Sequence, residues 1–118
     1  MALRRGAIVG ILFDQNTPAE GLMIPFIGSP AFTPVGPAAL SRATGAALIP
    51  MAIQGEGAGC YRITIRPEIS VAKTADRECD LREAMTALNS ALEELILMKP
   101  EEWVWFHDRW RAARSAAV

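Results

Sequence analysis

The chain has 118 residues, of which 51% are hydrophobic and 21% are charged, and its formal net charge is -1. This composition predicts one folded domain over residues 1–118 and excludes a disordered chain or a pair of domains. The small net charge provides no field that would attract a polyanion, so we expect no nucleic-acid partner. Basic residues gather only locally, at Arg4 and Arg5 and again at Arg109, Arg111 and Arg114.

The two cysteines and the amino-terminal residues exclude further classes of site. Cys60 and Cys79 lie far apart and belong to no cluster with metal-ligand spacing, so we expect no metal and no cofactor. Residues 1–13 imitate a signal peptide, but their apolar run is short and ends on Asp14 without a small-residue cleavage site. No run reaches the roughly 18 to 20 apolar residues that span a bilayer, so any membrane contact is expected to be peripheral.

The apolar stretch 6–13 contains β-branched residues and stops on the polar sequence Asp14-Gln15-Asn16. This pattern favours a buried strand that carries polar groups at its carboxyl end. Open α/β sheets place their ligand sites beyond such strand ends, which makes Asp14 and Gln15 the first candidate site residues. A turn or capping role for Asp14 is the competing interpretation.

Residues 17–34 contain four prolines and two glycines, which predicts a long loop. Its apolar part, 22–27, is interpreted as a lid, as a pocket wall, or simply as a loop packed on the core. A short helix is predicted over 38–44, with Pro37 at its first position and Gly45 after its end. Arg42 lies on this helix, where it either reaches an anion at the helix start or is solvated.

A strand is predicted over 46–53, followed by a Gly-rich hairpin connection over 54–59. Residues 61–66 alternate between apolar and polar side chains, which predicts a half-buried antiparallel strand. A long helix is predicted from Asp80 to Lys99, because Asp80 and Glu83 have capping-box spacing. Its apolar positions recur at helical intervals and are expected to form core: Leu81, Ala84, Met85, Leu88, Leu92, Leu95 and Ile96.

A further helix is predicted from Pro100 to Arg111, and it carries all three tryptophans and the only histidine. Three interpretations of this segment stay open. The tryptophans complete the core, or the segment rests on anionic lipid, or His107 and Arg109 contact a phosphate in a substrate pocket.

Several of these stretches together resemble the bacterial lipid A biosynthesis lauroyl/myristoyl acyltransferases, which are related to the glycerolipid acyltransferases. The resemblance rests on these pieces, in this order: Leu-Arg-Arg-Gly at 3–6 with Gly-Ile-Leu-Phe-Asp-Gln at 10–15, Pro-Phe-Ile-Gly at 25–28, Gly-Pro-Ala-Ala-Leu at 36–40, Thr-Gly-Ala at 44–46, Leu-Ile-Pro at 48–50, Tyr-Arg at 61–62, and Pro-Glu-Glu-Trp-Val-Trp-Phe-His-Asp-Arg-Trp at 100–110. Each piece is short, but the set is specific and runs almost from end to end of the chain.

The resemblance implies an α/β fold, in which a partial mixed sheet is flanked by helices as in the glycerolipid acyltransferase-like fold. It also implies transfer of a fatty acyl chain from acyl carrier protein or acyl-CoA to a hydroxyl of a lipid A precursor or related glycolipid. The implied place is the cytoplasmic face of the bacterial inner membrane. Carried over by position, Asp14 and Gln15 match a strand-end motif near the active site, Arg42 matches a basic helix position, and His107 and Arg109 match a carboxyl-terminal pattern.

The family's catalytic His-x-x-x-x-Asp motif is missing, because the residue five positions after His107 is Ala112. The resemblance therefore implies the carboxyl-terminal portion of an acyltransferase, inactive alone, in which sheet edges and apolar surface are left uncovered. The alternatives are a non-catalytic module that binds lipid or an acyl chain, and a small interaction domain.

Overall fold

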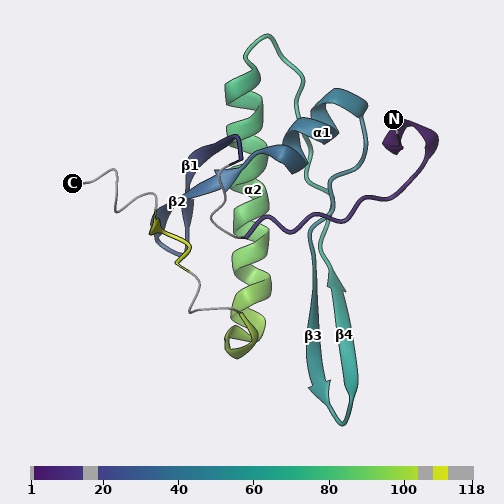
Figure 1. The fold of residues 1–118 in the computed structure, drawn as a ribbon, viewed down its shortest axis with the longest axis vertical. Helices are drawn as coiled ribbons and strands as arrows, with labels where there is room; N and C mark the ends of the chain where they lie inside the picture. Colours follow the sequence, from purple (N-terminus) through teal and green to yellow (C-terminus); the bar gives the residue numbers. More distant parts are fainter. Residues whose placement is uncertain (1, 15–18, 104–107, 112–118) are drawn as a thin grey trace.

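The computed structural model describes residues 2–14, 19–103 and 108–111. Pairs of strands are each followed by a helix along the chain, which is compatible with the predicted α/β class (Figure 1). The elements are η1 (Leu3–Arg5), β1 (Gly21–Phe26), β2 (Ser29–Pro34), α1 (Gly36–Thr44), β3 (Met51–Gly57), β4 (Cys60–Ile65), α2 (Arg77–Met98) and η2 (Pro100–Glu102), where η denotes a 3-10 helix.

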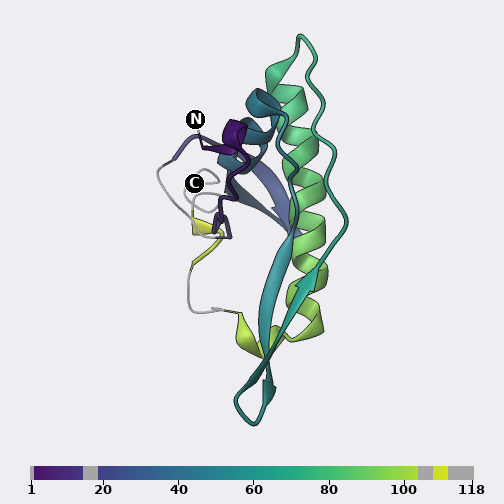
Figure 2. The same ribbon diagram turned by 90° about the vertical axis from the view of Figure 1, so that its right-hand side faces the viewer.

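The strands form two separate antiparallel hairpins within the described residues, β1 with β2 and β3 with β4. The prediction of a partial mixed sheet is not met there, because each strand pairs antiparallel with its neighbour in sequence. Both turns use positive φ angles, at Ile27 and Gly28 in the first hairpin and at Ala58 and Gly59 in the second. Helix α2 packs against β1 and β3, and the β3–β4 hairpin runs alongside the second half of α2 with its turn projecting beyond the end of the helix (Figures 1 and 2).

The core lies between α2, the first hairpin and α1. One cluster of buried residues contains Ile24, Val35, Ala38, Leu81, Ala84, Met85 and Leu88. A second cluster contains Phe26, Ala31 and Ile96, with Leu92, Trp103 and Trp110 packed against it. The apolar stripe predicted for the long helix is therefore confirmed as core.

Helix α1 ends at a capping glycine, and helix α2 begins at a capping aspartate. Helix α1 has Pro37 in its first turn and ends at Gly45, whose φ is 77° and whose N–H donates to the Ser41 carbonyl. The predicted helix over 38–44 is confirmed. Helix α2 begins three residues before the predicted start, because the Asp76 side chain caps it by accepting from the Cys79 N–H at 3.1 Å. The prediction that Asp80 opens this helix is wrong.

The predicted strand over residues 6–13 is absent. These residues run extended after η1 without pairing to a strand, and Ile8 and Leu12 are 97% and 88% exposed. A β-branched sequence forms a strand only where a neighbouring backbone supplies hydrogen bonds, and the described residues supply none here.

The long loop predicted over 17–34 is also wrong in its described part, because β1 and β2 occupy residues 21–34. Its prolines are compatible with a strand, since Pro25 and Pro30 lie opposite each other and a two-stranded ribbon leaves such positions without a ladder bond. The apolar residues at 22–27 are neither a lid nor a simple loop, since Ile24 and Phe26 face the core.

The remaining differences concern the second hairpin and the tryptophan-rich segment. The strand predicted over 46–53 is shifted, since β3 begins after Pro50 and continues to Gly57. Strand β4 pairs antiparallel with β3 as predicted, but it is mostly exposed instead of half-buried. Of the helix predicted from Pro100 to Arg111, the structure shows a 3-10 helix over Pro100–Glu102 that ends at Trp103, whose backbone is extended at φ -82° and ψ 147°. Residues 104–107 of this prediction lie outside the described residues.

Candidate functional site

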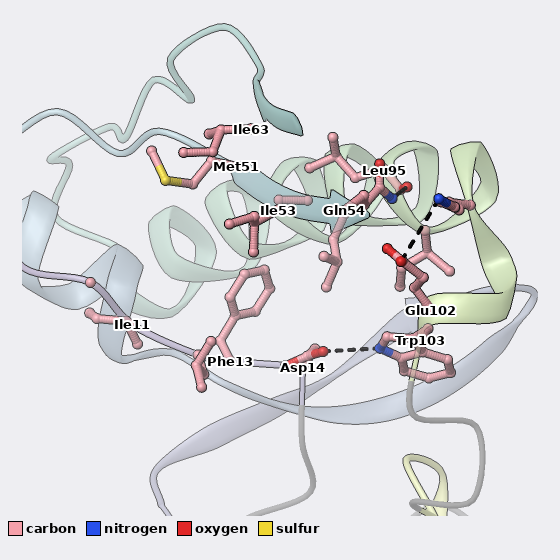
Figure 3. A pocket seen from close by; sticks show the side chains of 16 residues that line it. Ile11, Phe13, Asp14, Met51, Ile53, Gln54, Ile63, Leu95, Glu102 and Trp103 are labelled. Carbon is pink, nitrogen blue, oxygen red and sulfur yellow. Dashed lines mark hydrogen bonds and ion pairs between the residues drawn. The ribbon is translucent and has the colours of Figure 1, made fainter. Parts of the chain in front are cut away.

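A groove of about 720 Å³ lies among the described residues (Figure 3). The extended segment 10–14 forms one wall, β3 with Ile63 of β4 forms another, and the end of α2 with η2 closes the third side. Most of the lining is apolar, with Ile11, Phe13, Met51, Ile53, Ile63 and Leu95 among the contributing side chains. This volume lies within the range of roughly 300 to 1,000 Å³ that is typical of small-molecule binding pockets.

The polar side chains of the groove gather beside η2, as Figure 3 shows for Asp14, Gln54, Glu102 and Trp103. The Trp103 indole N–H donates to Oδ2 of Asp14 at 3.0 Å. This bond joins the extended segment to the end of η2 and fixes one carboxylate oxygen at the groove.

A second set of contacts holds the hairpin against the helix at Gly55. The Gly55 N–H donates to both carboxylate oxygens of Glu102, at 3.0 and 2.9 Å, and Lys99 donates to the Gly55 carbonyl. Next to it, Gln54 Nε2 donates to the Leu95 carbonyl at 2.8 Å. We call the contacts of Glu102 and Lys99 with Gly55 the Gly55 clasp. A Cβ at Gly55 would lie 2.8 Å from Glu102 Oε1, so a side chain at this position would displace the Glu102 carboxylate.

Arg109 lies behind the polar side of the groove and is fully buried. Its guanidinium donates to the Phe32 carbonyl and to Thr33 Oγ1, and it lies 5.4 Å from the centre of the Phe26 ring. Burial lowers the pKa of Arg109, and the negative charge of Asp14 acts in the opposite direction. Through these contacts Arg109 links the carboxyl-terminal segment to the first hairpin, which is a structural role.

The Phe26 ring also joins Arg109 to the groove. Trp103 packs edge-on against it at 5.5 Å, and Trp110 lies 5.9 Å away. Trp110 donates its indole N–H to the Phe26 carbonyl at 3.1 Å. The two described tryptophans therefore complete the core, as one of the three interpretations proposed, and Trp103 at the same time lines the groove.

Arg42 lies at the other end of α2. Its Nε donates to Oδ2 of Asp80 at 2.9 Å, and its Nη2 donates to the Thr74 carbonyl at 2.7 Å. Burial raises the pKa of Asp80, but hydrogen bonds from the Thr74 hydroxyl and N–H and from Arg42 outweigh it, so the pKa lies below its usual value. Arg42 thus ties α1 to α2 and is not part of the groove lining.

The five predicted site residues are only partly brought together. Asp14 lines the groove, Arg109 approaches it through Phe26 and Trp103, and Arg42 lies apart. Gln15 and His107 lie outside the described residues. The sequence reasoning missed Lys99 and Glu102, although their i,i+3 spacing across Pro100 is a signal for a pair that lies on one side of a turn.

The chemistry available in the described residues is that of binding. An apolar groove with carboxylates, an ammonium group and an indole along one side suits an elongated amphiphile, whose chain follows the walls while its polar part meets the charged groups. No His, Cys, Asp or Glu cluster that could hold a metal ion occurs among the described residues. Over the same residues, no helix is long and apolar enough to cross a membrane.

Comparison with known proteins gives the class. The bacterial lipid A biosynthesis acyltransferase profile matches residues 1–112, so the chain belongs to that family. Its relatives include the phosphatidylinositol mannoside acyltransferase of Mycobacterium tuberculosis H37Rv, which is 28% identical over 113 residues, or 96% of the chain. The lauroyltransferase and palmitoleoyltransferase of lipid A biosynthesis in Escherichia coli K12 are 29% and 31% identical, each over 93% of the chain.

The chain matches only part of each of these relatives. The aligned region covers 34% of the mycobacterial protein and 36% and 35% of the two Escherichia coli proteins. The chain therefore spans about a third of the length of the curated relatives it matches.

Proposed function

We propose that this chain supplies the acyl-chain groove of a lipid acyltransferase, which moves a fatty acyl chain from acyl carrier protein or acyl-CoA to a hydroxyl of a lipid A precursor or related glycolipid. The proposed place of action is the cytoplasmic face of the bacterial inner membrane. In this proposal the catalytic histidine and its carboxylate come from polypeptide beyond these 118 residues, and the chain alone is inactive.

The groove is the observation that carries the proposal. Its walls are aliphatic and aromatic over most of their area. Its polar lining contains Lys99, together with Asp14 and Glu102, which Figure 3 shows next to Trp103. Each methylene removed from water contributes about 0.8 kcal/mol, so an alkyl chain gains affinity with every carbon that the walls cover. Family membership and the names of the relatives, all of them acyltransferases, support the same assignment.

The reaction requires the acceptor hydroxyl oxygen to attack the thioester carbonyl. A carbon–oxygen bond forms, the hydroxyl proton passes to a general base, the carbon–sulfur bond breaks, and the base returns the proton to the departing sulfur, which leaves as the thiol. Residues of this chain would orient the donor. The acyl chain would lie along Ile11, Ile53 and Leu95, and the Asp14 carboxylate, fixed by Trp103, would position polar atoms near the reacting ester.

A role for Asp14 in turnover can be separated from a structural one. In an assembled enzyme that contains the histidine motif, Asp14→Ala is expected to lower kcat by at least about a hundredfold, as loss of a positioning group does, while soluble expression stays near normal. Loss of soluble protein in proportion to activity would instead make Asp14 a structural cap.

One observation favours a second candidate, a non-catalytic acyl-chain-binding module. The only histidine is His107, and no His-x-x-x-x-Asp motif can be drawn from it. Acyl binding with no transfer, when the chain is mixed with a polypeptide that bears this motif, would support the module.

Binding of acyl-CoA to the 118-residue chain tests the proposed groove. We expect calorimetric titration with lauroyl-, myristoyl- and palmitoyl-CoA to give tighter binding for longer chains, by up to about fourfold per methylene while the groove still covers the added carbon. Ile53→Asp places a charge on the groove wall and is expected to weaken binding at least about tenfold.

Ile65→Asp provides the matched control. Ile53 and Ile65 are similarly exposed, at 65% and 62%, and lie on the same face of the hairpin, but only Ile53 lines the groove. Equal loss of acyl-CoA binding in both variants, or affinities that do not change with chain length, would contradict the proposal.

A further inference from the structure

Strand β4 carries a row of exposed apolar side chains. Tyr61, Ile63 and Ile65 are 72%, 61% and 62% exposed, and alternate residues of a strand share one face. Their partners across the hairpin, Gly55, Ile53 and Met51, lie on the same face. Of these residues, Met51, Ile53 and Ile63 also line the groove, whereas Tyr61 and Ile65 lie outside it.

The backbone of the same residues points away from β3. The Arg66 N–H donates to the Pro50 carbonyl, so even-numbered positions of β4 make the ladder bonds and odd-numbered positions face outward. Consistently, Gly55, the partner of Tyr61, directs its backbone groups outward to the Gly55 clasp. Among the described residues, no other element pairs with the backbone at 61, 63 and 65.

The two edges of the hairpin therefore differ. The β3 edge is closed at Gly55 by side chains of Glu102 and Lys99, which occupy the positions that a neighbouring strand would use. The β4 edge has no such cover, and Figure 1 shows no labelled element beyond it. Natural edge strands are usually protected by charges or prolines, and the exposed face of β4 has neither between Tyr61 and Ile65.

Charges on the opposite face of β4 are already paired. Arg62 binds Glu56 with an Nε to Oε1 distance of 2.6 Å, and Arg66 pairs with Glu94 of α2. Both arginines are therefore already paired within the chain, and neither side chain lies on the face that carries the apolar row. A polypeptide that covers this row would therefore be selected by apolar contacts and main-chain hydrogen bonds, as in β-strand addition.

The length of the relatives indicates the occupant of this surface. The relatives contain about twice as much additional polypeptide as this chain supplies, since the matched part is 34% to 36% of their length.

We propose that the outer edge and apolar face of β4 form a docking surface for a strand of the polypeptide that supplies the rest of the acyltransferase domain. The side chains of Tyr61 and Ile65 contact that strand. The docked polypeptide also covers the open side of the groove next to Ile63. The inference rests on family membership and on the geometry of β4, and it holds whether or not the groove binds an acyl chain.

The experiment combines the 118-residue chain with the part of the Escherichia coli K12 lauroyltransferase that it does not match, expressed as a separate polypeptide. We expect a one-to-one complex by analytical ultracentrifugation. Hydrogen exchange of the 61, 63 and 65 amides should slow at least about tenfold in that complex, while the 62 and 64 amides, already in the ladder, change little.

Two variants separate docking from folding. Ile63→Pro removes an outward N–H and one apolar side chain of the row but no ladder bond, and it is expected to weaken the complex at least about tenfold with the β3–β4 ladder intact. Leu97→Glu changes a residue of α2 that is equally exposed, at 63%, and should alter affinity less than about twofold. A complex that leaves the β4 amides unprotected, no complex at all, or self-association through β4 that excludes the added polypeptide would each overturn the proposal.

Discussion

The indole of Trp103 donates a hydrogen bond to the Asp14 carboxylate across 89 positions of sequence, at 3.0 Å. The two residues belong to segments without regular structure of their own, and the bond joins them at the polar side of the groove. Trp103 is held in turn by Phe26 and Trp110. The position of the groove carboxylate therefore depends on the aromatic part of the core.

Replacing Trp103 tests this dependence. Trp103→Phe keeps an aromatic ring against Phe26 but removes the N–H that Asp14 accepts, so the free energy of unfolding is expected to fall by about 2 kcal/mol. Asp14→Asn retains an acceptor oxygen and is expected to cost less. Urea titration of the two variants and the double variant checks the coupling, and strictly additive losses would mean that the bond contributes nothing.

Alanine is expected to lower the free energy of unfolding more at Gly21, which faces a backbone oxygen, than at Gly55, which faces a side-chain oxygen. At Gly21 a Cβ would lie 2.5 Å from the Thr33 carbonyl oxygen, which the β1–β2 ladder holds in place, so Gly21→Ala is expected to cost about 3 kcal/mol. At Gly55 the obstructing atom is the end of the flexible Glu102 side chain, so Gly55→Ala should cost about 1 kcal/mol, the loss of the clasp. Thermal unfolding of both variants measures the order, and the reverse order would contradict it.

Arg109 is expected to resist conservative replacement. Arg109→Lys keeps the positive charge but loses the planar group over Phe26 and one of the bonds to Phe32 and Thr33, so stability should fall by about 2 kcal/mol. Arg111→Lys, at an exposed position two residues away, is the control and should change stability by less than about 0.5 kcal/mol. Similar losses of unfolding free energy for both variants in chemical denaturation would refute the structural role of Arg109.

The Asp80–Arg42 pair should make stability depend on pH in the acid range. The pKa of Asp80 is lower in the folded chain than in the unfolded chain, where it is about 3.9, so the unfolded chain binds more protons between the two values. The stabilisation is present above pH 4 and is lost as the pH falls through the folded pKa. Thermal midpoints measured from pH 6 to pH 2.5 should therefore fall less steeply for Asp80→Asn than for the unchanged chain, and parallel curves would contradict the assignment.

Local patterns in the sequence predicted those parts of the fold that local interactions determine. The sequence predicted the core stripe of α2, the Pro37 and Gly45 ends of α1, and the alternation in β4. Each of these features depends on residues within or next to one element. The family was also readable from short motifs in a fixed order.

Features that depend on distant partners could not be predicted in the same way. Residues 6–13 have strand propensity, but no backbone among the described residues pairs with them. Pro25 and Pro30 predicted a loop, although they occupy positions of a hairpin that make no ladder hydrogen bond. The Gly55 clasp and the Trp103–Asp14 bond join residues 44 to 89 positions apart, so sequence spacing carried no sign of them. Asp14 was a candidate because a polar residue after an apolar run is a local signal, and in the structure it lines the groove.

Photo-crosslinking tests the acyl groove most directly. A palmitoyl-CoA analogue with a diazirine at the end of its acyl chain would be bound to the 118-residue chain, irradiated and mapped by mass spectrometry. We expect labels on groove residues such as Ile11, Ile53 and Leu95, and competition by unlabelled palmitoyl-CoA. Labels confined to Tyr61 and Ile65, outside the groove, or labelling that palmitoyl-CoA does not suppress, would contradict the assignment of this groove to an acyl chain.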